Sequence, residues 1–469
     1  MKIEDLKVDD KLPQGWIILP LPDCVYFQEG PGLRKKQFAE QGIPFLNIRT
    51  FEDGFINKSK CRFVDEKEFT NRYEHFLLNE NDIVVSSSGT IGKIAVIRKQ
   101  DLPVMLNTSV IRFRSKYEDY LLQSYLKYYL QSQHFFQQID SSKTGSAIFN
   151  YGPSHLQEMS ILVPPLNEQK RIVAKLEKLL AKVNESCDRL SRIPTILKRF
   201  RQSVLASACS GRLTADWRKS HPDNPEWKDE ILIDIIKTKP RNGFSAKLVD
   251  LVDYETKTKI ITLTATTSGK FKGEYFKYLD QEIDLDSYVW LNPKDILIQR
   301  GNTIEYVGVS AIYEGLPHQF IYPDLMMKIQ VREDIADYRF IYYALSNIQT
   351  RQYFRDNATG TAGNMPKINQ QVVMNTPISL PPLEEQKEIV KRVEALFKKC
   401  DLIEQRYLNA KAYTDKLTQS ILAKAFRGEL VPQDPNDESA EVLLERIREE
   451  KTLTEKSSKS KKTSKRKTT

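Results

Sequence analysis

The chain has 469 residues, 40% of them apolar, 10% aromatic and 28% charged, and its formal net charge is +9. This length and apolar content predict two or three domains with sizeable cores. The chain has no run of 18 apolar residues and no long apolar segment in its first residues, so we expect neither a membrane span nor a signal peptide. The five cysteines are odd in number and scattered without a C-x-x-C pair. This pattern favours a reducing cytoplasm over a disulfide framework or a zinc site.

The positive charge is concentrated at the C-terminal end. Between Lys451 and Thr469 seven lysines and one arginine stand against Glu455 alone, a net charge of +7, which leaves +2 for the other 450 residues. A segment rich in Ser, Thr and Lys with few apolar residues is predicted to be disordered. Two roles stay open for it: nonspecific attraction to nucleic-acid phosphates or simple solubility.

The first globular module is predicted over residues 1–163. Its apolar segment Ile83–Val85 is a strand candidate and is followed by the polar, glycine-containing turn Ser86–Thr90. A stretch rich in Tyr and Phe, Tyr125–Phe136, is predicted to be helical and to belong to the core. It leads to a second polar turn, Lys143–Ser146.

None of these segments carries a recognisable catalytic motif. Ser88–Lys93 resembles the end of a phosphate-binding loop, but a Walker A motif requires Gly at position 87 and Ser or Thr at position 94, where Ser87 and Ile94 stand. The five histidines lack metal-binding spacing, and no nucleophile elbow or methyltransferase motif occurs. We therefore expect a non-catalytic chain without a cofactor or metal of its own.

A long helix is predicted over residues 164–213, after Pro164-Pro165 and up to Gly211. Steps of four and three residues from Ile172 to Val204 meet apolar residues at nine of ten positions, which is typical of a coiled-coil seam roughly 48 Å long. Pro194 lies inside this helix and predicts a bend near Arg192–Thr195, or alternatively a helical hairpin. The seam positions are Ile172, Leu176, Leu179, Val183, Ser186, Leu190, Ile193, Leu197, Phe200 and Val204.

The rest of the chain repeats this organisation, with a second strand candidate at Ile296–Ile298 and a second helical stretch rich in Tyr and Phe at Tyr338–Phe354. Pro164–Gln169 returns as Pro381–Gln386, an offset of 217 that holds for nearly fifty residues, and the second helix is predicted over residues 381–432. Within the second module, residues 214–380, the offset drifts from 211 to 215. Loops accept insertions whereas a packed helix does not, so each half is predicted to be a variable module followed by a helix of fixed length. The second seam comprises Ile389, Val393, Leu396, Cys400, Ile403, Tyr407, Ala410, Thr414, Leu417 and Ile421.

The two helices are expected to pair with each other, antiparallel, within one chain. The alternatives are that they dimerise with a second chain or that each covers its own module. The predicted fold class is α+β: two mixed α/β modules separated by an antiparallel coiled coil, with an internal pseudo-two-fold repeat.

The polar turns are the candidate recognition sites, because hydroxyl groups and Gln, Arg and Asn side chains form hydrogen bonds with base edges and phosphates. The turns occupy matching places in the two modules but differ in side chains, as expected of two modules that recognise different sequences. An ordinary solvated turn is the alternative for any one residue. The candidate DNA-contacting residues are Ser86, Ser87, Ser88, Thr90, Lys93, Lys143, Thr144 and Ser146 in the first module, and Gln299, Arg300, Asn302, Thr303, Thr359 and Thr361 in the second.

With its two P-P-L-x-E-Q-x-x-I-V helix openings, its Trp-led modules (Trp16 and Trp227) and its Gly-Arg-Leu and Gly-Glu-Leu helix ends, the chain resembles the specificity subunit of Type I restriction–modification systems. The resemblance covers nearly the whole chain up to about Asp437. It implies target-recognition domains at 1–163 and 214–380, helical spacers at 164–213 and 381–432, and a C-terminal segment at 433–469.

The resemblance also implies a function and partners. Each domain would recognise one half of a bipartite DNA site, and the helices would set the gap and bind methyltransferase subunits, two of them being expected. Methyltransferase and restriction subunits would hold S-adenosylmethionine, ATP and magnesium, and this chain would hold none. A coiled-coil scaffold with protein-binding modules is the rival interpretation, and a fused nuclease–methyltransferase is a third that the missing motifs disfavour.

Overall fold

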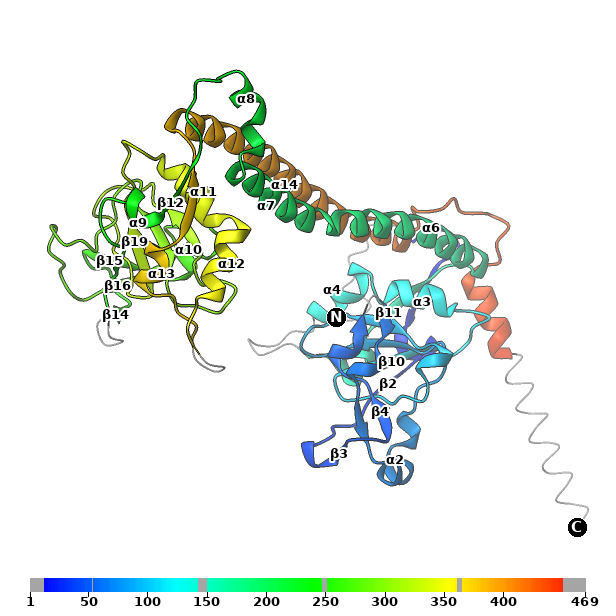
Figure 1. Cartoon of the computed structure of the whole chain (residues 1–469). Coiled ribbons are helices and arrows are strands. Elements are labelled where there is room, and N and C mark those ends of the chain that lie inside the picture. Colours follow the sequence, from blue (N-terminus) through cyan, green and yellow to red (C-terminus); the bar gives the residue numbers. More distant parts are fainter. Residues whose placement is uncertain (1–11, 53, 142–149, 247–250, 361–364, 450–469) are drawn as a thin grey trace, which may run out of the picture. The chain divides into compact units, whose positions relative to one another are not determined.

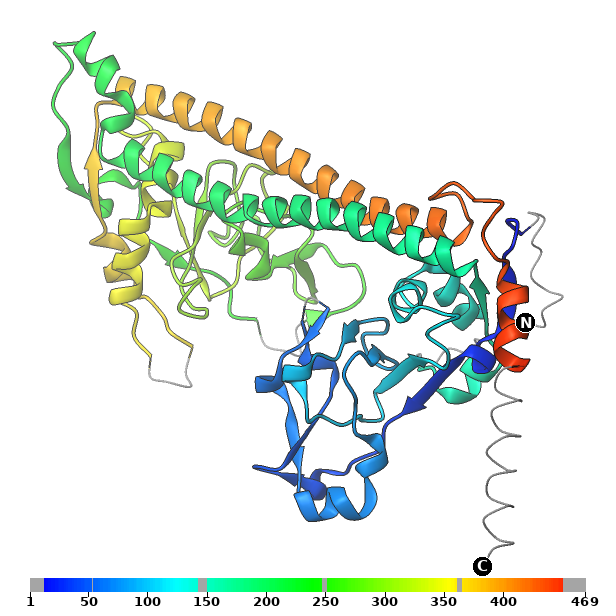
Figure 2. The same cartoon turned by 90° about the vertical axis from the view of Figure 1, so that its right-hand side faces the viewer.

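A computed structural model describes residues 12–52, 54–141, 150–246, 251–360 and 365–449 (Figures 1 and 2). The chain divides into two compact units, residues 1–189 with 410–469 and residues 190–409. Each unit therefore contains one globular module together with parts of both long helices. Within the described residues no helix is long and apolar enough to cross a membrane.

Unit 1 combines short antiparallel sheets with helices. Its main sheet has four strands in the order β2-β10-β8-β9, a second has the order β3-β7-β4, and β1 pairs with β11. The elements are β1 (Ile17–Pro20), α1 (Leu21–Cys24), β2 (Val25–Glu29), β3 (Phe38–Ala39), β4 (Ile43–Phe45), β5 (Phe51–Glu52), β6 (Phe55–Ile56), β7 (Arg62–Val64), α2 (Glu66–Arg72), β8 (Ile83–Ser86), β9 (Ile94–Val96), β10 (Val110–Ser115), α3 (Gln123–Tyr129), α4 (Gln133–Ser141), α5 (Pro153–Gln157), β11 (Ser160–Val163) and α6 (Leu166–Ser191).

Unit 2 repeats these sheets, and its strands follow one another along the chain in the same order. Its main sheet is β13-β19-β17-β18, its three-stranded sheet is β14-β16-β15, and β12 pairs with β20. The elements are α7 (Ile193–Cys209), α8 (Ala215–Lys219), β12 (Lys228–Ile231), α9 (Leu232–Ile235), β13 (Arg241–Asn242), β14 (Leu251–Val252), β15 (Thr258–Ile261), α10 (Thr264–Thr267), β16 (Phe276–Leu279), β17 (Ile296–Gln299), β18 (Ser310–Ile312), β19 (Met326–Ile329), α11 (Tyr338–Ser346), α12 (Ile348–Asp356), α13 (Gln370–Met374), β20 (Pro377–Leu380) and α14 (Leu383–Phe426).

The predicted strands and core helices are confirmed. Ile83–Val85 and Ile296–Ile298 lie in β8 and β17, the two strands that occupy matching places in the main sheets. The predicted stretches Tyr125–Phe136 and Tyr338–Phe354 form the helix pairs α3/α4 and α11/α12, and most of their aromatic side chains are buried in the cores. These aromatic side chains are therefore packing residues and not an exposed stacking surface.

The long helices pair antiparallel in each unit, as predicted. In unit 1 the start of α6, with Ile172 and Leu176, shares a buried cluster with Leu422 and Phe426 at the end of α14. In unit 2 the end of α7 packs against the start of α14, because Val204 and Leu205 share a cluster with Ile389 and Val393. Figure 1 shows α7 alongside the first part of α14. Eight of the ten seam positions of the first helix are buried or half-buried, the exceptions being Ser186 and Phe200. Of the ten seam positions of the second helix, Ile403 alone is exposed.

The first helix is interrupted where Pro194 predicted a bend. The segment α6 ends at Ser191, α7 begins at Ile193, and Pro194 occupies the first turn of α7, where its missing N–H costs no helical hydrogen bond. The one intervening residue, Arg192, keeps helical angles (φ −80°, ψ −23°), which leaves no reversing loop for a hairpin. Beyond the helices, Gly211 and Gly428 adopt the left-handed conformation, with φ of 73° and 74°, as expected for helix stops.

Candidate nucleic-acid interface

The repeated P-P-L-x-E-Q motif joins each helix to its module. In unit 1 the Gln169 amide donates to the carbonyl oxygens of Tyr120 (2.8 Å) and Pro164 (3.0 Å) and accepts from the Leu122 amide (2.9 Å). In unit 2 the Gln386 side chain makes the equivalent bonds, donating to Ile335 O (3.1 Å) and Pro381 O (2.7 Å) and accepting from Asp337 N (2.8 Å). Both glutamines are fully buried, and these bonds satisfy their amides. The helix start is thereby fixed to the backbone that follows the main sheet.

The glutamate beside each glutamine holds the tryptophan that opens the module. The Trp16 indole donates to Glu168 Oε2 (3.0 Å) and the Trp227 indole to Glu385 Oε2 (2.9 Å). We call this contact of the motif's Glu and Gln with the module the joint, and the joints of the two units differ in their other bonds. Glu385 also accepts from Thr214 Oγ1 (2.7 Å) and forms an ion pair with Arg218, whereas Glu168 Oε1 is buried without a hydrogen-bond partner in the part of the chain that the structure describes. Burial raises the pKa of Glu168.

The first candidate turn of unit 1 follows β8. The Ser86 hydroxyl donates to Thr90 O (2.6 Å) and accepts from Lys93 N (2.9 Å), so this side chain closes the turn. Ser86 and Ser87 are both buried, which does not fit the prediction that they contact DNA. The other members are accessible: Ser88 is half-buried, and Thr90 and Lys93 are exposed.

The matching turn of unit 2 follows β17. Gln299 is fully buried, and its amide donates to Leu263 O (2.9 Å) and Thr266 Oγ1 (2.9 Å), so its predicted DNA contact does not fit the structure either. Sequence reasoning misplaced Ser86 and Gln299 because each strand continues one residue beyond its apolar core, and that last polar side chain bonds within the module. Arg300 and Asn302 are half-buried and Thr303 is exposed.

The structure brings the two candidate turns of unit 2 together. The Thr359 and Lys367 backbones exchange two hydrogen bonds of 2.9 Å, and Ile368 N donates to Arg300 O (2.9 Å). A β-bridge also connects Gly301 with Lys367. The remaining predicted residues, Lys143, Thr144, Ser146 and Thr361, lie outside the described residues. In unit 1 Tyr151, which follows residues 142–149, donates its N–H to Ser87 O (3.2 Å) in the turn after β8.

Two residues that sequence reasoning missed belong to the same region of unit 2. Lys367 is exposed and lies beside Gly301, where it adds a positive charge to the turn pair. Arg351 of α12 donates to the carbonyl oxygens of Val307 (2.6 Å) and Glu305 (2.8 Å), and burial lowers its pKa to about 10. No spacing signal identified either residue, because both come from segments distant in sequence. Arg351 fixes the exposed loop that continues from the turn.

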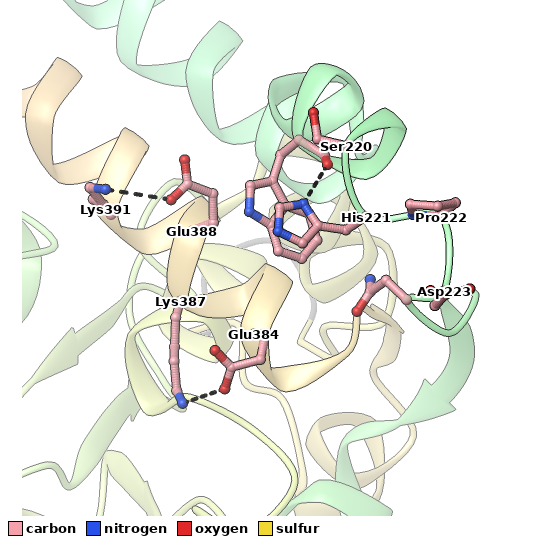
Figure 3. A pocket seen from close by; sticks show the side chains of 10 residues that line it. Ser220, His221, Pro222, Asp223, Glu384, Lys387, Glu388 and Lys391 are labelled. Atoms are coloured by element: carbon pink, nitrogen blue, oxygen red, sulfur yellow. Dashed lines mark hydrogen bonds and ion pairs between the residues drawn. The ribbon is translucent and has the colours of Figure 1, made fainter.

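A hollow of unit 2 is lined by other residues than these turns. It has a volume of about 620 Å³ and is lined by Trp217, residues 220–224 and four charged residues of α14. Figure 3 shows that Glu384 pairs with Lys387 and Glu388 with Lys391, so the charges on this wall neutralise each other. Among the described residues there is no cluster of three or more His, Cys, Asp or Glu side chains that could hold a metal ion.

Comparison with known proteins identifies the family. Residues 13–191 and 224–411 match the Type I restriction modification DNA specificity domain. The chain is 31% identical to the EcoKI specificity subunit of Escherichia coli K12, with 94% of this chain and 96% of that protein covered. It is 30% identical to the StySPI specificity subunit of Salmonella potsdam, with 94% and 97% covered.

Two solved structures share the fold. A chain from a study of complex assembly and conformational transition of the type I R-M system superposes with a TM-score of 0.68 at 18% identity, covering 89% of this chain and 99% of that one. The HsdS subunit from Thermoanaerobacter tengcongensis superposes with a TM-score of 0.50 at 18% identity, covering 89% and 98%. With two copies of the specificity domain and relatives matched over nearly their whole length, the chain belongs to the family of Type I restriction enzyme specificity subunits.

Proposed function

We propose that each unit recognises one half of a bipartite DNA target through the turn that follows β8 or β17. The observation that carries this proposal is that the two units share sheet order and helix joints but carry different side chains at the matching turn. Ser88, Thr90 and Lys93 are available in unit 1. In unit 2 the available residues are Arg300, Asn302, Thr303 and Thr359, together with Lys367. Different donors and acceptors at the same place would select different base pairs.

The chain itself is proposed to be non-catalytic and to work inside a larger complex. Its relatives are named specificity subunits of Type I restriction enzymes. Methyltransferase subunits, two of them, and restriction subunits would supply S-adenosylmethionine, ATP and magnesium. Apolar side chains exposed on the long helices, among them Ile196 and Phe200 on α7 and Leu402 and Leu408 on α14, would give the methyltransferase subunits an apolar surface to pack against.

The test of the half-site assignment is Arg300→Ala. Removing a guanidinium that contacts a base edge should cost about 1–3 kcal/mol of discrimination at one position. The adenine-methylation motif of cells that carry the complete system should then relax in the half recognised by unit 2 and stay unchanged in the other half. The control is Arg332→Ala, because Arg332 is an exposed residue of the same unit that pairs with Asp334. If both half-sites relax, or neither does, this assignment is wrong. A complex that contains the chain but shows no sequence preference would instead favour the protein-binding scaffold.

The helices are proposed to set the gap between the half-sites, and a paired insertion tests this role. In unit 2 Glu404 of α14 forms an ion pair with Arg201 (2.8 Å), and α6 contributes to unit 1 up to Arg189. Four residues inserted after Glu404 and four after Arg189 should therefore leave each unit's own contacts in place. Four helical residues add about 6 Å, close to two base-pair steps. The preferred gap should lengthen by about two base pairs, and an unchanged gap would contradict the proposal.

A further inference from the structure

A second element of each unit lies against the candidate turn. In unit 1 it is the single helical turn Ile48–Thr50 after β4, and in unit 2 it is α10 after β15. An added Cβ on Gly89, inside the turn after β8, would lie 2.8 Å from Ile48 Cδ1, so the two turns are in direct contact. In unit 2 the contact is polar, since the Gln299 amide donates to Leu263 O and Thr266 Oγ1, both at 2.9 Å.

Backbone contacts establish that the two elements are equivalent. Leu46 N donates to Met105 O (3.0 Å) in unit 1, and Ile261 N donates to Ile321 O (3.0 Å) in unit 2. The residue before each donor forms a parallel bridge to the same residue that accepts this hydrogen bond, Met105 or Ile321, and β4 and β15 occupy matching places in the three-stranded sheets. This pairing fixes an offset of 215, under which Arg49 corresponds to Thr264. The sequence repeat gave offsets of 211 and 213 on either side of this segment, so the correspondence was not visible in the sequence.

Arg49 is the exposed side chain of a rigid turn. Asn47 caps the turn, its Oδ1 accepting from Arg49 N (2.9 Å) and its amide donating to Lys60 O (3.3 Å). The Thr50 hydroxyl is buried and donates to Asn47 O (2.6 Å). The Arg49 side chain is exposed, and among the residues that the structure describes no carboxylate forms an ion pair with it. Its five N–H donors are therefore available to a ligand.

Thr264 has the same placement with a different chemistry. It is the first residue of α10 and is exposed, while Ala265 and Thr266 behind it are buried. A threonine offers one hydroxyl and one methyl group, whereas an arginine can donate two hydrogen bonds to the N7 and O6 atoms of guanine. Equivalent positions beside the proposed DNA-contacting turns thus differ in the property that distinguishes one base pair from another.

We propose that this helical turn is a second specificity-determining element of each unit, in which Arg49 contacts a guanine of the first half-site and Thr264 contacts a base pair of the second. The inference rests on the proposed function and adds to it two residues outside the turns after β8 and β17.

The test uses the full chain in its complex, and the probe is a library of duplexes randomised in one half-site at a time, with bound sequences counted. Arg49→Ala should reduce discrimination at one base pair of the first half-site by roughly 5- to 150-fold and leave the second half-site unchanged. Arg49→Lys should lose part of this discrimination, because the lysine ammonium lacks the rigid planar fork of donors that an arginine presents to N7 and O6. Thr264→Arg should create a preference for guanine in the second half-site.

The controls separate this inference from the proposed function. Arg72→Ala removes another exposed arginine of unit 1 and should leave both motifs intact. An equal loss of binding to all sequences in Arg49→Ala, restored by Arg49→Lys, would identify a phosphate contact and overturn the inference. Unchanged motifs in all three variants would overturn it as well. A wild-type complex that enriches no sequence would refute the proposed function itself, and this inference with it. The melting temperatures should match that of the wild type, because the capping bond of Arg49 uses its backbone N–H.

Discussion

Replacing the matched glutamates with glutamine should affect the two units differently, although the substitution is the same. Glu385 is fully buried, bonds with Trp227 and Thr214, and forms an ion pair with Arg218. Glu168 is equally buried and bonds with Trp16, but its second oxygen has no hydrogen-bond partner among the described residues. Glutamine keeps the shape and removes the charge. The change therefore breaks an ion pair in unit 2 and removes a poorly solvated charge in unit 1.

The magnitudes follow from this difference. Breaking a buried ion pair by removing one partner costs 3–5 kcal/mol, and because one third of the Arg218 side chain is exposed we expect about 3 kcal/mol for Glu385→Gln. Glu168→Gln keeps an acceptor for the Trp16 indole and removes the cost of burying an unpaired charge, so the free energy of unfolding should change by less than about 1 kcal/mol. The free energies of local unfolding of the two variants should differ by at least about 2 kcal/mol, which is more than a tenfold difference in the equilibrium constant for opening of the joint.

Hydrogen–deuterium exchange of the full chain, followed on peptides that contain β1 and β12, measures this difference separately in each unit. These strands lie next to Trp16 and Trp227 and pair with β11 and β20, which lead into the two helices. Glu385→Gln should accelerate exchange in β12 and leave β1 unchanged, and Glu168→Gln should accelerate neither. Equal acceleration by the two variants, each in its own unit, would refute the argument that Arg218 makes the joints different.

Four further predictions rest on individual contacts. Because the pKa of Glu168 is raised, the folded state keeps a proton on this carboxyl at a higher pH than the unfolded state does. The stabilisation from this proton is fully present below the ordinary pKa of 4.5 and is lost as the pH rises through the raised pKa. Urea unfolding measured across this pH range should show the dependence in the wild type, and Glu168→Gln should remove it. Leu422→Ala should destabilise the chain by about 2–5 kcal/mol in urea unfolding, against less than about 0.5 kcal/mol for the exposed Leu402→Ala. Arg351→Lys should loosen the loop after β17, because a lysine lacks the planar fork of the guanidinium, whose two terminal nitrogens donate separately to the two carbonyl oxygens. The expected results are faster exchange at Val307 and a relaxed second half-site with an unchanged first one. Gly211→Ala should destabilise the joint of unit 2 by about 1 kcal/mol or more from its φ of 73° alone, and a melting temperature equal to the wild type would contradict this strain.

The sequence predicted the frame of the molecule better than its candidate interface. Helices and main strands were recoverable because apolar periodicity and a constant offset of 217 depend on packing, which tolerates few changes. The side chains at the turns were harder to place. Ser86 and Gln299 are polar and stand at the end of a strand, and composition alone does not show whether such a residue bonds inside the module or faces solvent. Arg49, Arg351 and Lys367 join the turns only through tertiary contacts.

The seam shows the same limit within the helices. The 3.5-residue repeat predicted a continuous apolar stripe, yet Phe200 and Ile403 are exposed although both occupy seam positions. Pairing is strong where each helix meets a module, at Ile172 with Leu422 and at Val204 with Ile389. The heptad pattern therefore identified the helices and the side of each that pairs, but not the seam positions that the partner helix leaves exposed.

The chemistry of the joints explains how modules of different specificity can share one helical frame. Gln169 and Gln386 bond with backbone atoms of their modules, and these bonds are independent of the side chains there. The residues that differ between the units lie on turns that close within their own module, through Ser86 in one and Gln299 in the other. Because neither joint uses a turn residue, a substitution such as Arg49→Ala or Arg300→Ala leaves the attachment to the helices unchanged. The proposed recognition residues and the joints share none of these contacts, so substitutions in the two places are expected to have additive effects on the free energy of unfolding.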